Sequence, residues 1–225
     1  HTGSERIASQ SRLLSTSALG PRGEPAMALE GSVFIAGAAV QWLRDELRIV
    51  AKSADTQALA RQSRDRTQPY VVPAFVGLGA PYWDAQARGA ILGITRGTTR
   101  ADLVRATLDS IAYQVHDVLA AMESDTHRRI RELRADGGAA ANNYLMQFQA
   151  DILGRAVRRP KMAETTALGA AMLAGLVAGV WRSPDQLANL RNSDRVFKPA
   201  MQPRVRAHLL DGWKSAVSRV LSTPK

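Results

Sequence analysis

The amino-acid sequence predicts an α/β domain, and three observations support this class. Short apolar segments of strand length alternate with longer segments in which apolar residues recur every three or four positions, as on one face of a helix. Hydrophobic residues make up 45% of the 225 residues, which is enough for a buried core. The sequence shows no internal repeat or low-complexity tract. The chain is therefore expected to fold rather than to remain disordered.

The first 28 residues have the pattern of a β-hairpin. The segment GPRGEP at 20–25 is typical of a turn, and a second strand is expected at 26–29. A helix is expected next, because the apolar residues of 33–47 recur at helical spacing. Ser32 stands where an N-cap residue would begin this helix.

The middle of the chain alternates between loops and short strands. A polar stretch, 52–68, precedes the apolar segment 70–75, which has the pattern of a buried strand. The Gly/Pro-rich segment GLGAPYWD at 77–84 is expected to be a loop. Another short strand is expected at 90–94.

A long helix is expected to start after Thr99. Thr99 and Asp102 have the spacing of a capping box, in which the two side chains satisfy each other's backbone N–H groups. Apolar residues then recur at helical spacing as far as Met122. A short strand is expected at 133–135.

The last third of the sequence begins at a glycine turn. Asp136-Gly137-Gly138 breaks the strand, and the next helix is expected to end at Gly154. A brief strand at Val157 precedes a helix of small residues at 166–180, whose glycines have the spacing of helix packing. We expect residues 184–225 to be a C-terminal helical extension.

Composition argues against several classes of function. The chain has no cysteine, so a disulfide framework and a thiolate metal site are excluded. The four histidines show no paired metal-ligand spacing, and no apolar run is long enough to cross a membrane. The net charge is +10, but the arginines lie in scattered clusters without interleaved aromatic residues. Nucleic acid is therefore not an expected partner; the alternatives are a solvated basic face, or a surface for anionic ligands or an acidic partner domain.

The turn DGGAAANN at 136–143 carries the clearest local signal of chemistry. Two adjacent glycines allow a ligand to approach the backbone closely, and the start of the following helix offers N–H groups to a phosphate. Asn142, four residues after Gly138, is expected one turn into the helix, where its amide can bond a base or a ribose. The alternative is an ordinary turn between a strand and a helix.

The stretch GAILGITRGTTRADLVRATLD, 89–109, resembles the signature of the FGGY family of carbohydrate kinases. Further segments, among them YVVPAF, GLGAPYWD, DGGAAANNYLMQFQADILG and TALGAAMLAGL, are similar to those of the glycerol kinases within that family. The resemblance covers nearly the whole chain and weakens at 51–68 and after Arg182. In sugar kinases of the family, Gly-Glu-Arg usually precedes the loop proline. Here Gly77-Leu78-Gly79-Ala80 precedes Pro81, which favours glycerol over a sugar.

The resemblance implies an actin-like, ribonuclease H-like fold, with residues 1–225 forming the nucleotide-binding C-terminal half of a kinase. It implies ATP/ADP and Mg²⁺ as cofactors and a cytoplasmic enzyme. It also implies that six residues bind the nucleotide: Gly37, Gln41, Asp136, Gly137, Gly138 and Asn142. From the sequence alone, Gly37 is equally well explained as a helix-packing glycine. For Gln41, a solvated helix residue is the preferred interpretation without the resemblance.

The resemblance also places the catalytic base in the N-terminal half, so no catalytic residue and no metal ligand is expected in this chain. The expected partners are glycerol, ATP and the N-terminal kinase half, and a homo-oligomer stays open. A kinase for another small polyol or a ketose is the alternative enzyme. A non-catalytic actin-like nucleotide-binding domain is the alternative from another class.

Overall fold

The computed structural model describes residues 1–20, 23–64, 68–162, 164–188 and 193–222. Helices and strands mix along the chain, as expected for an α/β protein. The elements in chain order are β1 (Leu14–Leu19), β2 (Pro25–Glu30), α1 (Gly37–Asp45), α2 (Asp55–Ala60), β3 (Tyr70–Val72), β4 (Ala90–Leu92), α3 (Arg100–Thr126), β5 (Glu132–Arg134), the 3-10 helix η1 (Gly138–Ala141), α4 (Asn143–Leu153), β6 (Ala156–Pro160), α5 (Thr165–Val177), α6 (Pro184–Ala188), β7 (Ser193–Phe197) and α7 (Pro203–Ser218).

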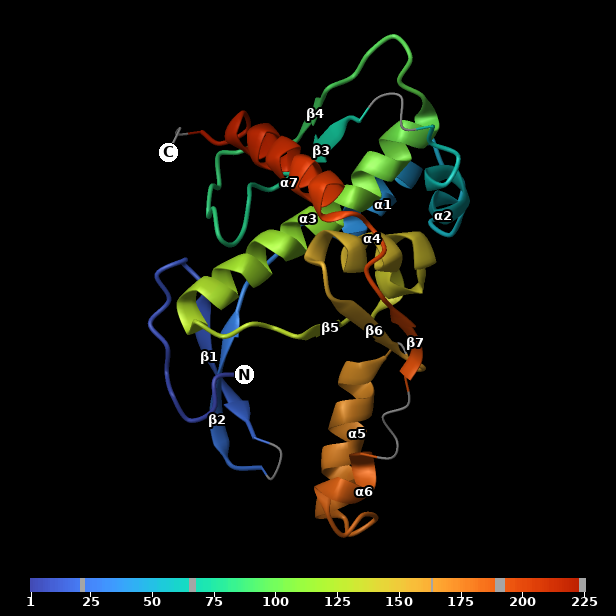
Figure 1. Cartoon of the computed structure of the whole chain (residues 1–225). Coiled ribbons are helices and arrows are strands. Elements are labelled where there is room, and N and C mark those ends of the chain that lie inside the picture. The colour runs from blue at the N-terminus through green and yellow to red at the C-terminus, as the bar shows by residue number, and fades with distance from the viewer. Residues whose placement is uncertain (21–22, 65–67, 163, 189–192, 223–225) are drawn as a thin grey trace.

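Helix α3 runs through the centre of the molecule, with α4 on one side and α7 across it (Figure 1). Its start confirms the expected capping box. Thr99 Oγ1 accepts from the Asp102 backbone N at 3.3 Å, and Asp102 Oδ2 accepts from the Thr99 backbone N at 2.8 Å. This reciprocal pair satisfies two N–H groups at the helix start and sets its first residue.

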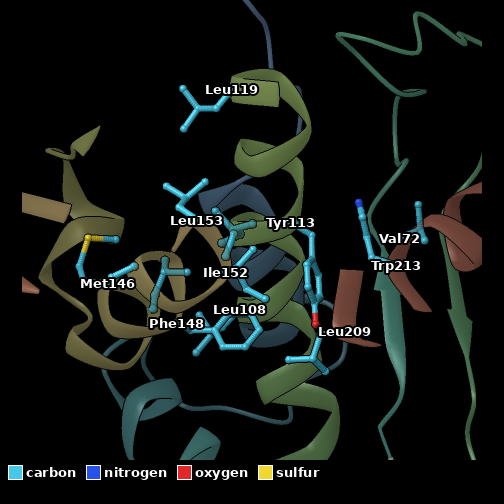
Figure 2. Close-up of a cluster of buried hydrophobic side chains, with 14 of the residues drawn as sticks. Val72, Leu108, Tyr113, Leu119, Met146, Phe148, Ile152, Leu153, Leu209 and Trp213 are labelled. Atoms are coloured by element: carbon cyan, nitrogen blue, oxygen red, sulfur yellow. The ribbon is translucent and has the colours of Figure 1, made fainter. Parts of the chain in front are cut away.

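The largest buried cluster lies where α3, α4 and α7 meet. Tyr113 of α3 stacks on Trp213 of α7 with ring centroids 5.2 Å apart, and Phe148 of α4 packs edge-on against Tyr113 at 5.5 Å. Figure 2 shows these side chains turned toward one another between the helices. Trp213 is fully buried, and its Nε1 donates to Asp117 Oδ2 at 2.7 Å. Segments 100 residues apart in the sequence therefore share one core.

Within the described residues, three small sheets complete the fold. β1 and β2 form the expected antiparallel hairpin, although residues 21–22 of its turn lie outside the described residues. β3 pairs antiparallel with β4. In the third sheet β6 lies between β5, which is parallel to it, and β7, which is antiparallel. The connection from β5 to β6 passes through the 136–143 turn and α4, so the sheet presents this turn at the end of β5.

The first helix begins later than its apolar spacing indicates, at Gly37 rather than at Val33. Long-range contacts hold the preceding residues out of the helix. The Ser32 carbonyl accepts from the Ala80 N at 3.0 Å, and the Ile35 carbonyl accepts from Gln114 Nε2 at 3.1 Å. Ser32 is therefore not the N-cap.

Two further expectations need correction. The polar stretch 52–68 contains a helix, α2, and the C-terminal segment is more than a helical extension. Its strand β7 joins the sheet of β5 and β6, and its helix α7 contributes Trp213 and Leu209 to the main core. The apolar face of α7 is buried against Tyr113 of α3 and against β3 and α4, which is why this segment packs onto the domain.

Asp109 of α3 is a buried carboxyl group whose pKa burial raises to about 7, although the Arg105 guanidinium 3.6 Å away and a hydrogen bond from Tyr144 oppose this. Since the pKa in the unfolded chain is near 3.8, the folded protein holds the proton longer. We expect stability to fall by roughly 2–4 kcal/mol as pH rises from about 4 to about 7, and to level off above that.

Urea denaturation between pH 4 and pH 8 checks this, with Asp109→Asn as the control. Asparagine retains an acceptor for the Tyr144 hydroxyl but does not titrate. Equal pH slopes for the two proteins would contradict the assignment.

Candidate nucleotide-binding site

The 136–143 turn begins at the end of β5. Asp136 is exposed, and Gly137 has φ +79°, a left-handed conformation that favours glycine. The chain then forms η1, in which the Ala140 N donates to the Gly137 carbonyl at 3.1 Å. Gly137 is thus the residue whose conformation the turn requires.

Gly138 differs from Gly137. Its backbone φ is not positive, and a Cβ added there would meet no atom within 4 Å. Gly138 is exposed at the start of η1. Its missing side chain therefore leaves open space above the backbone, which is the geometry a closely approaching ligand needs.

Asn142 is the N-cap of α4, not a residue one turn inside it. Its Oδ1 accepts from the Leu145 N at 3.1 Å, and its Nδ2 donates to Thr56 Oγ1 of α2 at 3.2 Å. Such a cap stabilises a helix by ~1 kcal/mol. An amide has two N–H groups and two lone pairs, so these bonds leave donor and acceptor capacity for a ligand.

Gly37 and Gln41 lie one turn apart on the exposed face of α1. The opposite face buries Ala39, Val40 and Leu43. A Cβ at Gly37 would meet nothing within 4 Å, so close helix packing does not explain this glycine. Gly37 is the first residue of α1 rather than a mid-helix residue.

The structure places the two predicted segments on one core without joining them directly. Val40 of α1 and Ala140 of η1 belong to the same buried cluster. In the part of the chain that the structure describes, no hydrogen bond connects Gly37 or Gln41 to residues 136–142. The two exposed, glycine-containing segments therefore pack on the same hydrophobic core.

Three polar residues that the sequence did not indicate hold the turn from outside. Gln57 Oε1 of α2 accepts from the Asn143 N at 2.6 Å, beside the bond between Thr56 and Asn142. Arg159 of β6 donates to the carbonyls of Ala140 and Ala141. The sequence showed only the local composition around these residues. Thr56 and Gln57 lie in a polar stretch, and Arg159 lies in an arginine-rich stretch.

The arginines of this stretch, Arg155, Arg158 and Arg159, do not form a simple solvated face. Arg155 pairs with Glu123, and Arg158 pairs with Glu132 at 3.2 Å. Arg155 additionally donates to the Ile130 carbonyl at 2.7 Å.

The described cavities lie elsewhere. A cavity of about 10 Å³ lies near Asp109, and an open groove of about 580 Å³ is lined by Arg64, Arg100 and four neighbouring residues. Neither is lined by a predicted site residue. Four of the six predicted residues, Gly37, Gln41, Asp136 and Gly138, are exposed on this chain.

No helix in the described residues is long and apolar enough to span a membrane.

Comparison with known proteins matches residues 4–178 to the C-terminal domain of the FGGY family of carbohydrate kinases. A glycerol kinase of Symbiobacterium thermophilum is 58% identical over 219 residues, covering 97% of this chain and 44% of the relative. A protein named glycerol kinase 2 from Thermotoga maritima is 55% identical over 225 residues, covering 100% and 45%. The chain thus spans less than half the length of these relatives.

A solved structure supports the same family relationship. The crystal structure of Plasmodium falciparum glycerol kinase with ADP superposes with a TM-score of 0.89 at 35% identity, covering 99% of this chain and 44% of that one. The expected actin-like fold is therefore confirmed.

Proposed function

Because this chain belongs to the FGGY family of carbohydrate kinases, we propose that it is the nucleotide-binding half of an enzyme that phosphorylates glycerol with ATP. The observation that carries the proposal is identity of 55–58% to glycerol kinases over essentially the whole chain. The product is glycerol 3-phosphate, and the proposed compartment is the cytoplasm. The loop at Gly77–Pro81, which lacks the Gly-Glu-Arg usual in sugar kinases, supports glycerol over a sugar.

We assign the adenosine side of the nucleotide to Asp136, Gly137, Gly138 and Asn142. The support is geometric. Gly138 leaves space above the backbone, and Gly137 adopts the left-handed conformation that the turn requires. The Asn142 amide beside them retains unused hydrogen-bond donors and acceptors. An ADP-bound relative of the same fold makes an adenine nucleotide the natural ligand.

Gly37 and Gln41 are assigned to the nucleotide through α1. The N-cap of this helix, Ala36, has no side-chain acceptor, and its first turn contains no acidic residue. The positive end of the helix dipole is therefore not neutralised locally and would favour a phosphate. An exposed Gln41 amide one turn further is free to bond the nucleotide.

No cluster of metal-ligand side chains is found among the described residues. Across residues 1–20, 23–64, 68–162, 164–188 and 193–222, no group of three or more His, Asp or Glu side chains could hold a metal ion. Mg²⁺ is therefore proposed only as the ion that accompanies the nucleotide phosphates.

Helix α5 supports a partner half. Met172 is its buried residue, whereas Leu173 is 56% and Val177 91% exposed. Figure 1 shows α5 and α6 extending away from the rest of the chain. Exposed apolar helices of this kind mark interfaces. We propose that the N-terminal half of the complete enzyme covers α5.

Titration of the 225-residue chain with MgADP, followed by NMR, tests the proposal. We expect chemical-shift changes centred on residues 37–41 and 136–142, the two exposed segments that the proposal assigns to the nucleotide. Glycerol, titrated in parallel, should produce none, because its binding residues are proposed to lie in the other half. Shift changes confined to the groove beside Arg64 and Arg100 would show that the nucleotide site has been misplaced.

A further inference from the structure

Arg159 contacts the 136–143 turn more extensively than any other side chain described. Its Nη1 lies 3.0 Å from the Ala140 carbonyl oxygen, 3.3 Å from that of Ala141 and 3.1 Å from Asn143 Oδ1. Ala140 is buried, so its carbonyl cannot rely on bulk water for a partner. A charged donor shared among three acceptors ties the end of η1 to the start of α4.

The guanidinium is itself held in place. It lies 5.6 Å from the ring centre of Phe197, a buried residue of β7. Arg159 also belongs to β6, whose parallel partner β5 leads into the turn. The sheet thus holds both the entrance to the turn and the side chain that fixes its exit.

The opposite side of the turn rests on α2. Thr56 accepts from the Asn142 amide, and Gln57 accepts from the Asn143 backbone at 2.6 Å. Residues 138–143 are therefore held between a strand and a helix. The surface left uncovered includes Gly138, Ala139 and Ala141, which are exposed.

We propose that Arg159 is a positioning residue for nucleotide binding: it fixes residues 140–143 so that Gly138 and Asn142 present one preformed surface to adenosine. This inference rests on the proposed function. Without Arg159 the turn samples other conformations. The apparent affinity for the nucleotide then falls in proportion to the fraction of molecules whose turn is in the binding-competent conformation. The effect falls on the adenosine part of the ligand rather than on the phosphates.

The test uses Arg159→Met, with Arg158→Met as the matched control. Both variants remove one guanidinium from β6, but successive residues of a strand point to opposite faces, and Arg158 pairs with Glu132 instead of the turn. Arg159→Lys keeps the charge and most of the stem, in case the methionine variant folds poorly. Affinities for ADP and for adenosine, and amide hydrogen exchange at residues 138–143, are measured for each.

Arg159→Met is expected to weaken ADP and adenosine by the same factor, about 10-fold, and to speed exchange in the turn. Arg159→Lys should show a smaller loss in both ligands, and Arg158→Met should leave both affinities unchanged. Unchanged affinity despite faster exchange would overturn the proposal, because Arg159 would then be structural only. The proposal would also be overturned if Arg159→Met and Arg158→Met weakened ADP binding equally and left adenosine binding unchanged. That result would show a general charge effect. If the unsubstituted chain binds neither ligand, the proposed function itself has failed.

Discussion

The 225-residue chain by itself is expected to bind MgADP and yet not to phosphorylate glycerol. The reason is that the general base is proposed to lie in the N-terminal half, and general-base assistance is worth ~10²–10⁴ in rate. Loss of the positioning that the second half would supply lowers the rate further. A coupled ADP-release assay with glycerol should give a rate at least ~10⁴-fold below the ~1–100 s⁻¹ typical of kinases.

The structure also argues against a substitute base within this chain. Asp84 in the 77–84 loop accepts hydrogen bonds from the backbone N–H groups of Ser222, Gln86 and Ala87. These hydrogen bonds hold the pKa of the Asp84 carboxyl below its usual value, and the bond from Ser222 has the largest effect. The hydrogen bond from Ser222 ties the loop to the segment that follows α7. Asp136 lies in the turn that we propose binds adenosine, and the proposal places it away from the transferred phosphoryl group.

An intact glycerol kinase, assayed in parallel, serves as the positive control for turnover. A glycerol-dependent rate within a few-fold of that control, from the 225 residues alone, would mean that the chain contains a complete site. The proposal that the general base lies in the N-terminal half would then be wrong.

Gly138→Val is expected to abolish nucleotide binding while leaving the fold intact. A branched side chain would fill the space above the turn that adenosine needs, so we expect ADP affinity to fall by about 100-fold or more, equivalent to ~2.8 kcal/mol. The fold should tolerate the change, because a Cβ at Gly138 meets no atom within 4 Å and the backbone there is not left-handed. Calorimetric titration with ADP and a thermal melt measure the two effects.

Gly97→Val is the matched control, since Gly97 lies outside the proposed site and its added Cβ would meet a single atom, Thr95 Oγ1, at 3.7 Å. It should bind ADP as the parent chain does. Unchanged ADP affinity in a folded Gly138→Val protein would remove Gly138 from the site. Gly137→Val would be a poor test, because strain at φ +79° would disturb the turn itself.

Local signals predicted much of the fold correctly. The hairpin of β1 and β2, the capping box at Thr99 and the αL residue Gly154 at the end of α4 each depend on residues within a few positions of one another. The same holds for the open turn at 136–138. Where neighbouring residues supply the hydrogen bonds, the sequence alone is sufficient.

Features that depend on distant residues were not predictable in this way. The start of α1 is decided by hydrogen bonds from Ala80 and Gln114, and the burial of Trp213 in α7 depends on Tyr113 of α3. Asn142 became a cap because η1 occupies the preceding four residues.

The division at the candidate site follows the same physical rule. The glycine turn could be located from neighbouring residues, and the family resemblance assigned it to a nucleotide. The groups that hold the turn could be identified only from tertiary contacts, since Thr56 and Gln57 lie 86 positions away from the residues they bond, and Arg159 acts from a neighbouring strand. Hydrogen bonds between distant segments exist only once the core has brought those segments together.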